Sequence, residues 1–224
     1  MFQAVLFDMD GLMFDTERLA KQAWTEVCAQ FGVEIGETVL SRIRGATPEA
    51  SAAVFREVYG AEFPYYEARA ARKSWVENFI AKEGVPVKQG LSTLLMHLQN
   101  AGIHAAVVSS SAEATIWRYL EMSSLISFFE VVIGEERLGR SKPAPDGYLS
   151  AARLLHTQPS DCLILEDSAN GLLAAKNAGI TAVCIPDIAP PEEKALQTAA
   201  AVLNSLDDVW EWMKQIQKTE KTSF

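Results

Sequence analysis

Short apolar segments alternate with helical stretches along the second half of the chain, and this pattern is the strongest indication of its fold. From Gly90 onward, each segment of strand length is separated from the next by a segment with the apolar spacing of a helix. Parallel strands need such long crossover connections, so the pattern indicates βαβ units. We therefore predict an α/β fold with a doubly wound parallel sheet that is covered by helices on both faces. The expected strands span residues 4–6, 104–108, 130–133, 162–165 and 181–185, and the expected helices after Gly90 span residues 91–101, 112–121, 146–156, 168–178 and 206–216, with fraying from Lys218.

Residues 16–85 differ from the rest, because they contain consecutive helical patterns and no convincing strand. Thr47 followed by Pro48 offers an N-cap and then a proline at the first helical position, which is a typical helix start. The simplest account is an all-helical domain over 16–85 that is inserted into an α/β core domain formed by residues 1–15 and 86–224. The expected helices of the insert span about 16–31, 48–60 and 64–82.

Composition and charge limit the partners of the chain. It has 224 residues, 29 acidic and 20 basic, and its formal net charge of −9 argues against nucleic acid or an anionic membrane as the main partner. No apolar run approaches the length of a membrane span, and the first residues lack the basic segment of a signal peptide. The three cysteines form no C-x-x-C pair, which fits a reducing compartment, and the three histidines are too scattered to indicate zinc binding or a Ser/His triad. We expect a cytoplasmic protein, monomeric or weakly homo-oligomeric.

Two acidic residues, Asp8 and Asp10, follow the first apolar segment. Extended backbone repeats every two residues, so both carboxylates point to the same side and Met9 points away. Such close acids repel unless a cation lies between them or one keeps its proton, which suits a magnesium site with a carboxylate nucleophile and an acid/base beside it. The alternatives are a solvated turn and the start of a calcium loop, but Gly11 comes too early for that loop.

Ligands of a parallel sheet bind at the carboxyl ends of its strands, so chemistry is expected where a strand stops. The second strand ends in Ser109, Ser110 and Ser111 just before a helix. Hydroxyls and free backbone N–H groups at such a place can hold a phosphate. Alternatively, Ser110 or Ser111 only caps the helix, with Glu113 completing a capping box, and both interpretations can hold together.

Two further candidates lie in the last third of the chain. Lys142 stands before Pro143 and near Pro145, which stiffen the loop, so its ammonium is held in place to balance carboxylates and a phosphate. Glu166 and Asp167 directly follow an apolar strand, and they bring the number of carboxylates expected at one sheet edge to four. Such crowding indicates a divalent cation, although one of the pair could simply cap the next helix.

The residues just described resemble the motifs of the haloacid dehalogenase-like superfamily, in its phosphoglucomutase/phosphatase branch. The resemblance covers essentially the whole chain and implies that the helical insert is a cap over the active site. It implies Asp8 as nucleophile and Asp10 as acid/base for a leaving alcohol and an attacking water. It implies Mg²⁺ held by Asp8, the backbone carbonyl of Asp10, Asp167 and, directly or through water, Glu166. The phosphoryl group would be stabilised by Ser109, the amide of Ser110 and Lys142. The motifs that match are Asp8-Met9-Asp10-Gly11, Gly90, Ser109, Lys142-Pro143-x-Pro145-Asp146 and Glu166-Asp167-Ser168-x-x-Gly171.

The resemblance leaves several reactions to compare. Dehalogenases of the superfamily work without magnesium and do not need the second aspartate, so Asp10 and the Glu166-Asp167 pair disfavour them. Phosphoglucomutases of the branch carry a cap histidine where this chain has Ala20, and a cap arginine for the distal phosphate near Thr47-Pro48, where this chain has no arginine. Both differences disfavour a mutase. A non-catalytic phosphate-binding module would be expected to lack one of the motif residues, and none is missing. The expected function is therefore hydrolysis of a small phosphorylated metabolite, such as a sugar phosphate, with a mutase as the alternative.

Overall fold

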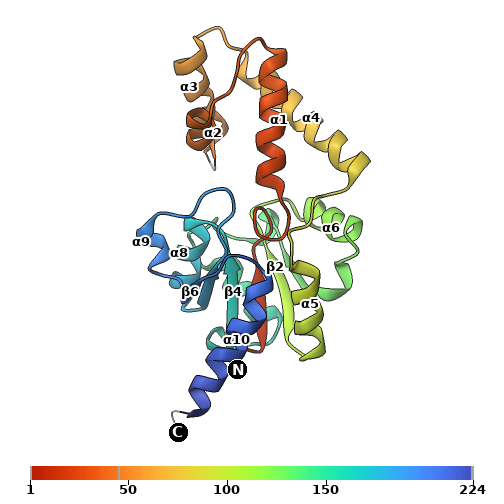
Figure 1. The fold of residues 1–224 in the computed structure, drawn as a ribbon, viewed down its shortest axis with the longest axis vertical. Coiled ribbons are helices and arrows are strands. Elements are labelled where there is room, and N and C mark those ends of the chain that lie inside the picture. Colours follow the sequence, from red (N-terminus) through yellow and green to blue (C-terminus); the bar gives the residue numbers. More distant parts are fainter. Residues whose placement is uncertain (1, 45, 223–224) are drawn as a thin grey trace. The chain divides into compact units, whose positions relative to one another are not determined.

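The computed structural model of the chain describes residues 2–44 and 46–222, and the side chains up to residue 217. The chain divides into two compact units (Figure 1). The first unit, Met1–Asp15 with Val85–Phe224, is called the core unit below, and the second, Thr16–Gly84, is called the helical cap. Each helix in the described part of the chain is too short or too polar to cross a membrane.

The core unit is built on a six-stranded parallel sheet with the order β3-β2-β1-β4-β5-β6. This is the order of a doubly wound fold, so the predicted fold class is confirmed. β1 lies in the middle, and its Ala4 pairs with His104 of β2 on one side and with Cys162 of β4 on the other. The strands span Ala4–Phe7 (β1), His104–Val108 (β2), Val131–Ile133 (β3), Cys162–Glu166 (β4), Thr181–Cys184 (β5) and Ala201–Val202 (β6).

The strands of the sheet are buried on both faces because helices cover it. Alternate strand residues such as Leu6, Val108 and Ile164 belong to one hydrophobic cluster with Tyr148 of α7 and Leu172 of α8. α5 contacts β2 and also packs against α10. The helices of the core unit span Leu91–Asn100 (α5), Glu113–Met122 (α6), Asp146–Leu154 (α7), Ala169–Ala178 (α8), Glu193–Leu196 (α9) and Asp207–Thr222 (α10).

The helical cap has a hydrophobic cluster of its own. Phe55 is fully buried there, and its ring lies 5.1 Å from those of both Trp24 and Tyr65. Thr47 caps α3 by accepting a hydrogen bond from the Ala50 N–H, as its sequence predicts. The cap helices span Thr16–Gln30 (α1), Glu37–Ile43 (α2), Pro48–Tyr59 (α3) and Tyr65–Glu83 (α4).

The two chain segments that join the cap to the core run beside each other within the core unit. The N–H of Asp15 donates to the carbonyl of Pro86, and the N–H of Lys88 donates to the carbonyl of Met13. The sequence did not predict the short elements α2, α9 and β6. It predicted fraying from Lys218, but α10 continues to Thr222, and residues 223–224 lie outside the described part.

Candidate active site

The predicted site residues follow the strands that surround β1. Asp8 comes directly after β1, Ser109 directly after β2, and Glu166 ends β4 with Asp167 next. β1 pairs with both β2 and β4, so these ends are neighbours at one edge of the sheet. The order of the strands also changes direction at β1, which is where doubly wound sheets bind their ligands.

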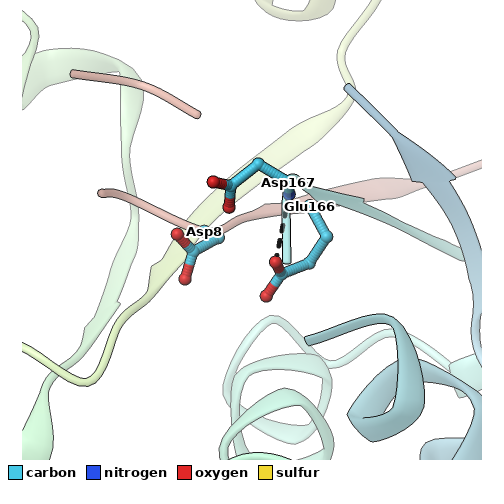
Figure 2. Close-up of side chains that lie close together, drawn as sticks. All are labelled: Asp8, Glu166 and Asp167. Carbon is cyan, nitrogen blue, oxygen red and sulfur yellow. Dashed lines mark hydrogen bonds between the residues drawn. The ribbon is translucent and has the colours of Figure 1, made fainter. Parts of the chain in front are cut away.

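Three carboxylates meet at this edge. One oxygen from each of Asp8, Glu166 and Asp167 lies within 4.8 Å of the other two (Figure 2). The chain makes room for them at Gly11, which has φ +86°, because a Cβ at Gly11 would collide with the carboxylate of Asp167. Gly11 therefore permits both the turn after Asp10 and the close approach of the Asp167 carboxylate.

Lys142 reaches this cluster from the loop before α7. Its ammonium donates to Asp8 Oδ1 at 2.5 Å, to Glu166 Oε1 at 2.6 Å and to the carbonyl of Val108 at 3.1 Å. An ammonium has three N–H donors, so each has an acceptor, and the three acceptors lie at the carboxyl ends of β1, β2 and β4. Burial acts to lower the pKa of Lys142, but Asp8 and Glu166 outweigh it and hold the pKa well above its usual value.

Glu166 is fully buried and hydrogen-bonded at both of its oxygens. Oε1 accepts from Lys142 and from the hydroxyl of Tyr148 at 2.7 Å. Oε2 accepts from the N–H of Asp167 and from the N–H and hydroxyl of Ser168. Burial acts to raise the pKa of Glu166, but Lys142 and these hydrogen bonds outweigh it and lower the pKa. Glu166 is therefore held as an anion behind Asp8.

The other two carboxylates are not balanced in this way. Burial raises the pKa of Asp8 to about 7, although Lys142 opposes the shift, and Glu166 and Asp10 add to it. Burial, with Asp8, Glu166 and Asp187 adding their charges, raises the pKa of Asp167 to about 9. Lys142 alone does not offset this negative charge, so an oxygen-ligand set of this kind fits a hard divalent cation.

The serines after β2 lie beside Asp10. The Ser111 hydroxyl donates to Asp10 Oδ2 at 2.7 Å, and the N–H of Ser111 donates to Ser109 Oγ at 3.0 Å. Ser109 is buried and Ser110 is exposed. The alternative of a capping box is wrong, because Ala112 is the N-cap of α6 and the Glu113 carboxylate accepts from the N–H of Gly134 instead.

The model of the haloacid dehalogenase-like hydrolases matches residues 5–185. The chain belongs to this family. The same match includes the helical cap and the predicted site residues from Asp8 to Asp167. Membership of the haloacid dehalogenase-like hydrolases confirms the resemblance that the sequence motifs predicted.

Curated relatives within the haloacid dehalogenase-like hydrolases include a mutase and phosphatases. The chain is 30% identical to β-phosphoglucomutase of Bacillus subtilis (strain 168), over 93% of this chain and 96% of that protein. It is 31% identical to hexitol phosphatase A of Escherichia coli (strain K12), over 91% of each. It also matches the bifunctional riboflavin kinase/FMN phosphatase of Arabidopsis thaliana at 30% identity, but spans only 54% of that protein's length.

A solved structure shares the whole fold. It is a haloacid dehalogenase-family hydrolase from Deinococcus radiodurans R1 with bound phosphate and sodium. Sequence identity is 27%, the TM-score is 0.81, and the match covers 93% of each chain.

Sequence reasoning missed three contacts at the site of this haloacid dehalogenase-like hydrolase. The Tyr148 bond to Glu166 joins residues 18 positions apart, and Ser111 reaches Asp10 across 101 positions. Lys88, in the segment leaving the cap, donates to Asp187 Oδ1 at 2.6 Å, and both side chains are largely buried. A signal for Asp187 was present, because it follows the end of β5 just as the other acids follow β1 and β4.

Proposed function

We propose that this chain is a Mg²⁺-dependent phosphatase that hydrolyses a small phosphomonoester of the sugar-phosphate class through a phosphorylated Asp8. The observation that carries the proposal is the buried Lys142, which joins Asp8 to Glu166 beside Asp167. The names of relatives such as hexitol phosphatase A and the probable pseudouridine-5'-phosphatase of Drosophila melanogaster support the substrate class. We also propose a cytoplasmic enzyme, monomeric or weakly homo-oligomeric, without nucleic-acid or membrane partners.

The donor set supports a proposal for the metal ligands. Asp8, the backbone carbonyl of Asp10 and Asp167 would hold Mg²⁺, and Glu166 would act through water because its oxygens already accept five hydrogen bonds. When bound, the ion supplies positive charge for the phosphoryl oxygens.

The chain's own residues then have distinct roles. Lys142 favours the ionised form of Asp8, and only a carboxylate can attack phosphorus. Ser111 orients Asp10, which donates a proton to the leaving alcohol and later takes one from the water that hydrolyses the phosphoaspartate. Ser109 Oγ accepts from the N–H of Ser111, so its own proton is available for a phosphoryl oxygen, as is the amide of Ser110.

The cap supports hydrolysis over transfer between sugars. A mutase must also hold a second phosphate, and mutases of the family carry an arginine for it near Thr47-Pro48, where this chain has no arginine. They also carry a cap histidine at the position of Ala20. We propose that the cap excludes bulk water and selects the leaving group, with hinges near residues 14–16 and 85–90.

The decisive experiment measures phosphate release from p-nitrophenyl phosphate. Wild-type protein should turn over with Mg²⁺ and stop with EDTA, and Asp8→Asn should be inactive. Asp10→Asn should lose much of its rate but still bind Mg²⁺ in calorimetry, because its backbone carbonyl remains. Turnover in Asp8→Asn at the wild-type rate would exclude the covalent step, and absence of Mg²⁺-dependent release from every ester tested would favour a non-catalytic module.

A further inference from the structure

A second buried lysine, Lys88, pairs with a carboxylate at the edge of the sheet that carries the site. Its ammonium donates to Asp187 Oδ1 at 2.6 Å, and the two side chains are only 16% and 4% exposed. Asp187 follows β5, which pairs with β4 as β4 pairs with β1. In the order of the strands, Asp167 therefore lies between Asp8 and Asp187.

The carboxylate of Asp187 is a neighbour of the proposed metal ligands. A Cβ at Gly11 would collide with Asp167 Oδ2 and would lie 3.4 Å from Asp187 Oδ2, so both carboxylates border the same turn. Burial raises the pKa of Asp167 to about 9, and the charge of Asp187 adds to this shift. Among the described residues, the three carboxylates that approach one another within 4.8 Å are those of Asp8, Glu166 and Asp167. Asp187 therefore acts on this group from just outside it.

The backbone of Lys88 is fixed to the chain that follows the same turn. Lys88 belongs to residues 85–90, the segment that leaves the cap, and its N–H donates to the carbonyl of Met13 at 2.9 Å. Met13 comes two residues after Gly11. The ammonium thus reaches Asp187 from a segment that is hydrogen-bonded to the loop behind the acid pair.

Stability alone is a poor explanation for this ion pair. The cost of removing two charges from water largely offsets their attraction, so a buried pair adds little net stability. Its effect on a neighbouring charged site is larger, because charges interact strongly where water is excluded. Asp187 attracts a cation at Asp167, and Lys88 opposes that attraction.

We propose that Asp187 and Lys88 are positioning residues of the Mg²⁺ site. Asp187 adds negative charge beside Asp167, and Lys88 balances this charge and holds the Asp187 carboxylate outside the set of metal ligands. The inference rests on the proposed phosphatase function and adds to it two residues that act on a metal ligand. The affinity for Mg²⁺ then depends on the two residues in opposite directions. A pair that only anchored the segment would weaken Mg²⁺ binding when either partner was lost.

Calorimetric titration of the full-length protein with Mg²⁺ measures these directions. It is done at low ionic strength and at pH 9, where protons compete less with the metal. Asp187→Asn should bind Mg²⁺ about three- to tenfold more weakly than the wild type, and Lys88→Met about three- to tenfold more tightly. Unchanged or weaker binding in Lys88→Met would overturn the proposal, as would unchanged or tighter binding in Asp187→Asn.

A double variant shows where the tighter binding comes from. Lys88→Met/Asp187→Asn should lose the gain, because the carboxylate that Lys88 no longer balances is then also neutral. A gain that persists in the double variant would exclude Asp187 as its source. If Lys88→Met does not fold, Lys88→Gln replaces it, since glutamine removes the charge but keeps an N–H donor for Asp187.

Two exposed residues of the core unit provide matched controls. Lys176 and Glu121 lie in the last turns of α8 and α6, two helices whose first turns follow site residues. Lys176→Met and Glu121→Gln change the net charge as Lys88→Met and Asp187→Asn do, and both should bind Mg²⁺ within about twofold of the wild type. Shifts as large as those of the paired residues would place the effect in the overall charge of the protein.

Phosphate release measured on the same proteins separates this inference from the proposed function. Opposite shifts in Mg²⁺ affinity would support the role of the pair even if the wild type hydrolysed no ester. Unchanged affinities in an active wild type would exclude the role of the pair and leave the phosphatase in place. A wild type that binds no Mg²⁺ would overturn both.

Discussion

The ammonium of Lys142 lies between two carboxylates that would otherwise repel each other. The prolines in its loop were the reason to predict Lys142 as a site residue from the sequence. In the structure, Asn177 of α8 also fixes this loop by donating to the carbonyl of Pro143 at 2.9 Å. The sequence did not show that Glu166 is fully buried and accepts from Lys142 and Tyr148. The position of Lys142 therefore depends on Glu166, and that of Glu166 depends partly on Tyr148.

Tyr148→Phe tests this chain of contacts. It removes the hydroxyl that donates to Glu166 but keeps the ring, whose centre lies 4.9 Å from Lys142 Nζ. We expect the free energy of unfolding to fall by about 1–2 kcal/mol and kcat to fall several-fold at nearly constant KM, because the buried acceptor loses a partner and Lys142 is held less firmly.

Urea unfolding and steady-state kinetics measure the two effects of Tyr148→Phe. Tyr66→Phe is the control, since Tyr66 is exposed in the cap. A change in stability without a change in kcat would mean that Tyr148 only fills the core.

The raised pKa values of Asp8 and Asp167 predict how the metal-free protein responds to pH. They are about 7 and about 9, whereas an unfolded aspartate has a pKa near 4. The folded state keeps protons that the unfolded state releases, so this contribution to stability is complete below about pH 4 and is lost as the pH rises through 7 and 9.

The melting temperature in EDTA should therefore fall between pH 6 and pH 9, and less steeply in Asp167→Asn than in the wild type. Mg²⁺ competes with those protons, so the increase in melting temperature that it causes should grow with pH. Thermal melts over this range with and without Mg²⁺ check both trends. The same pH slope in wild type and Asp167→Asn would show that Asp167 does not keep its proton in the fold.

At the scale of elements, the start of α8 is built around the buried Glu166. Ser168 caps the helix by accepting from the N–H of Gly171, and it also donates to Glu166. There is no room for a side chain at position 171, because a Cβ on Gly171 would occupy the place of the Glu166 carboxylate. The spacing of Glu166, Ser168 and Gly171 in the sequence therefore reflects close packing of the start of α8 against the end of β4.

Gly171→Ala separates this packing from helix propensity. Alanine at an exposed helical position would stabilise α8 by about 1 kcal/mol, but here we expect a loss of about 2–3 kcal/mol and a large fall in kcat, because Glu166 must move. Urea unfolding and phosphate release measure these effects. Asn170→Ala, at the exposed neighbouring position, is the control and should be neutral or stabilising. A stabilised Gly171→Ala would contradict the packing seen here.

The sequence predicted the longer elements and the residues at the strand ends, for a physical reason. Apolar spacing reports burial over many residues, and strand ends are where a parallel sheet presents its side chains. The seven residues of α2 and the two of β6 are too short to show a period. The partners of Glu166 and the Lys88–Asp187 pair depend on contacts between distant segments, which local patterns do not contain.

At the scale of the whole molecule, each unit has its own hydrophobic cluster. The cluster of the core unit includes Leu172 of α8, and that of the cap includes Phe55 of α3. Units with separate cores can open locally without global unfolding. We therefore expect that a large-to-small substitution in one cluster lowers the stability mainly of the unit that contains it.

Hydrogen exchange on two core variants tests this expectation. Phe55→Ala removes a fully buried ring and should cost about 3–5 kcal/mol in the cap. Exchange should accelerate over residues 16–84 while amides of β1 and β4 stay protected. Leu172→Ala, also fully buried, should loosen the core unit instead and leave protection in α1 and α4 closer to the wild type. If either variant accelerates exchange equally in both units, they unfold as one cooperative body, and the cap then cannot open independently of the sheet that carries Asp8.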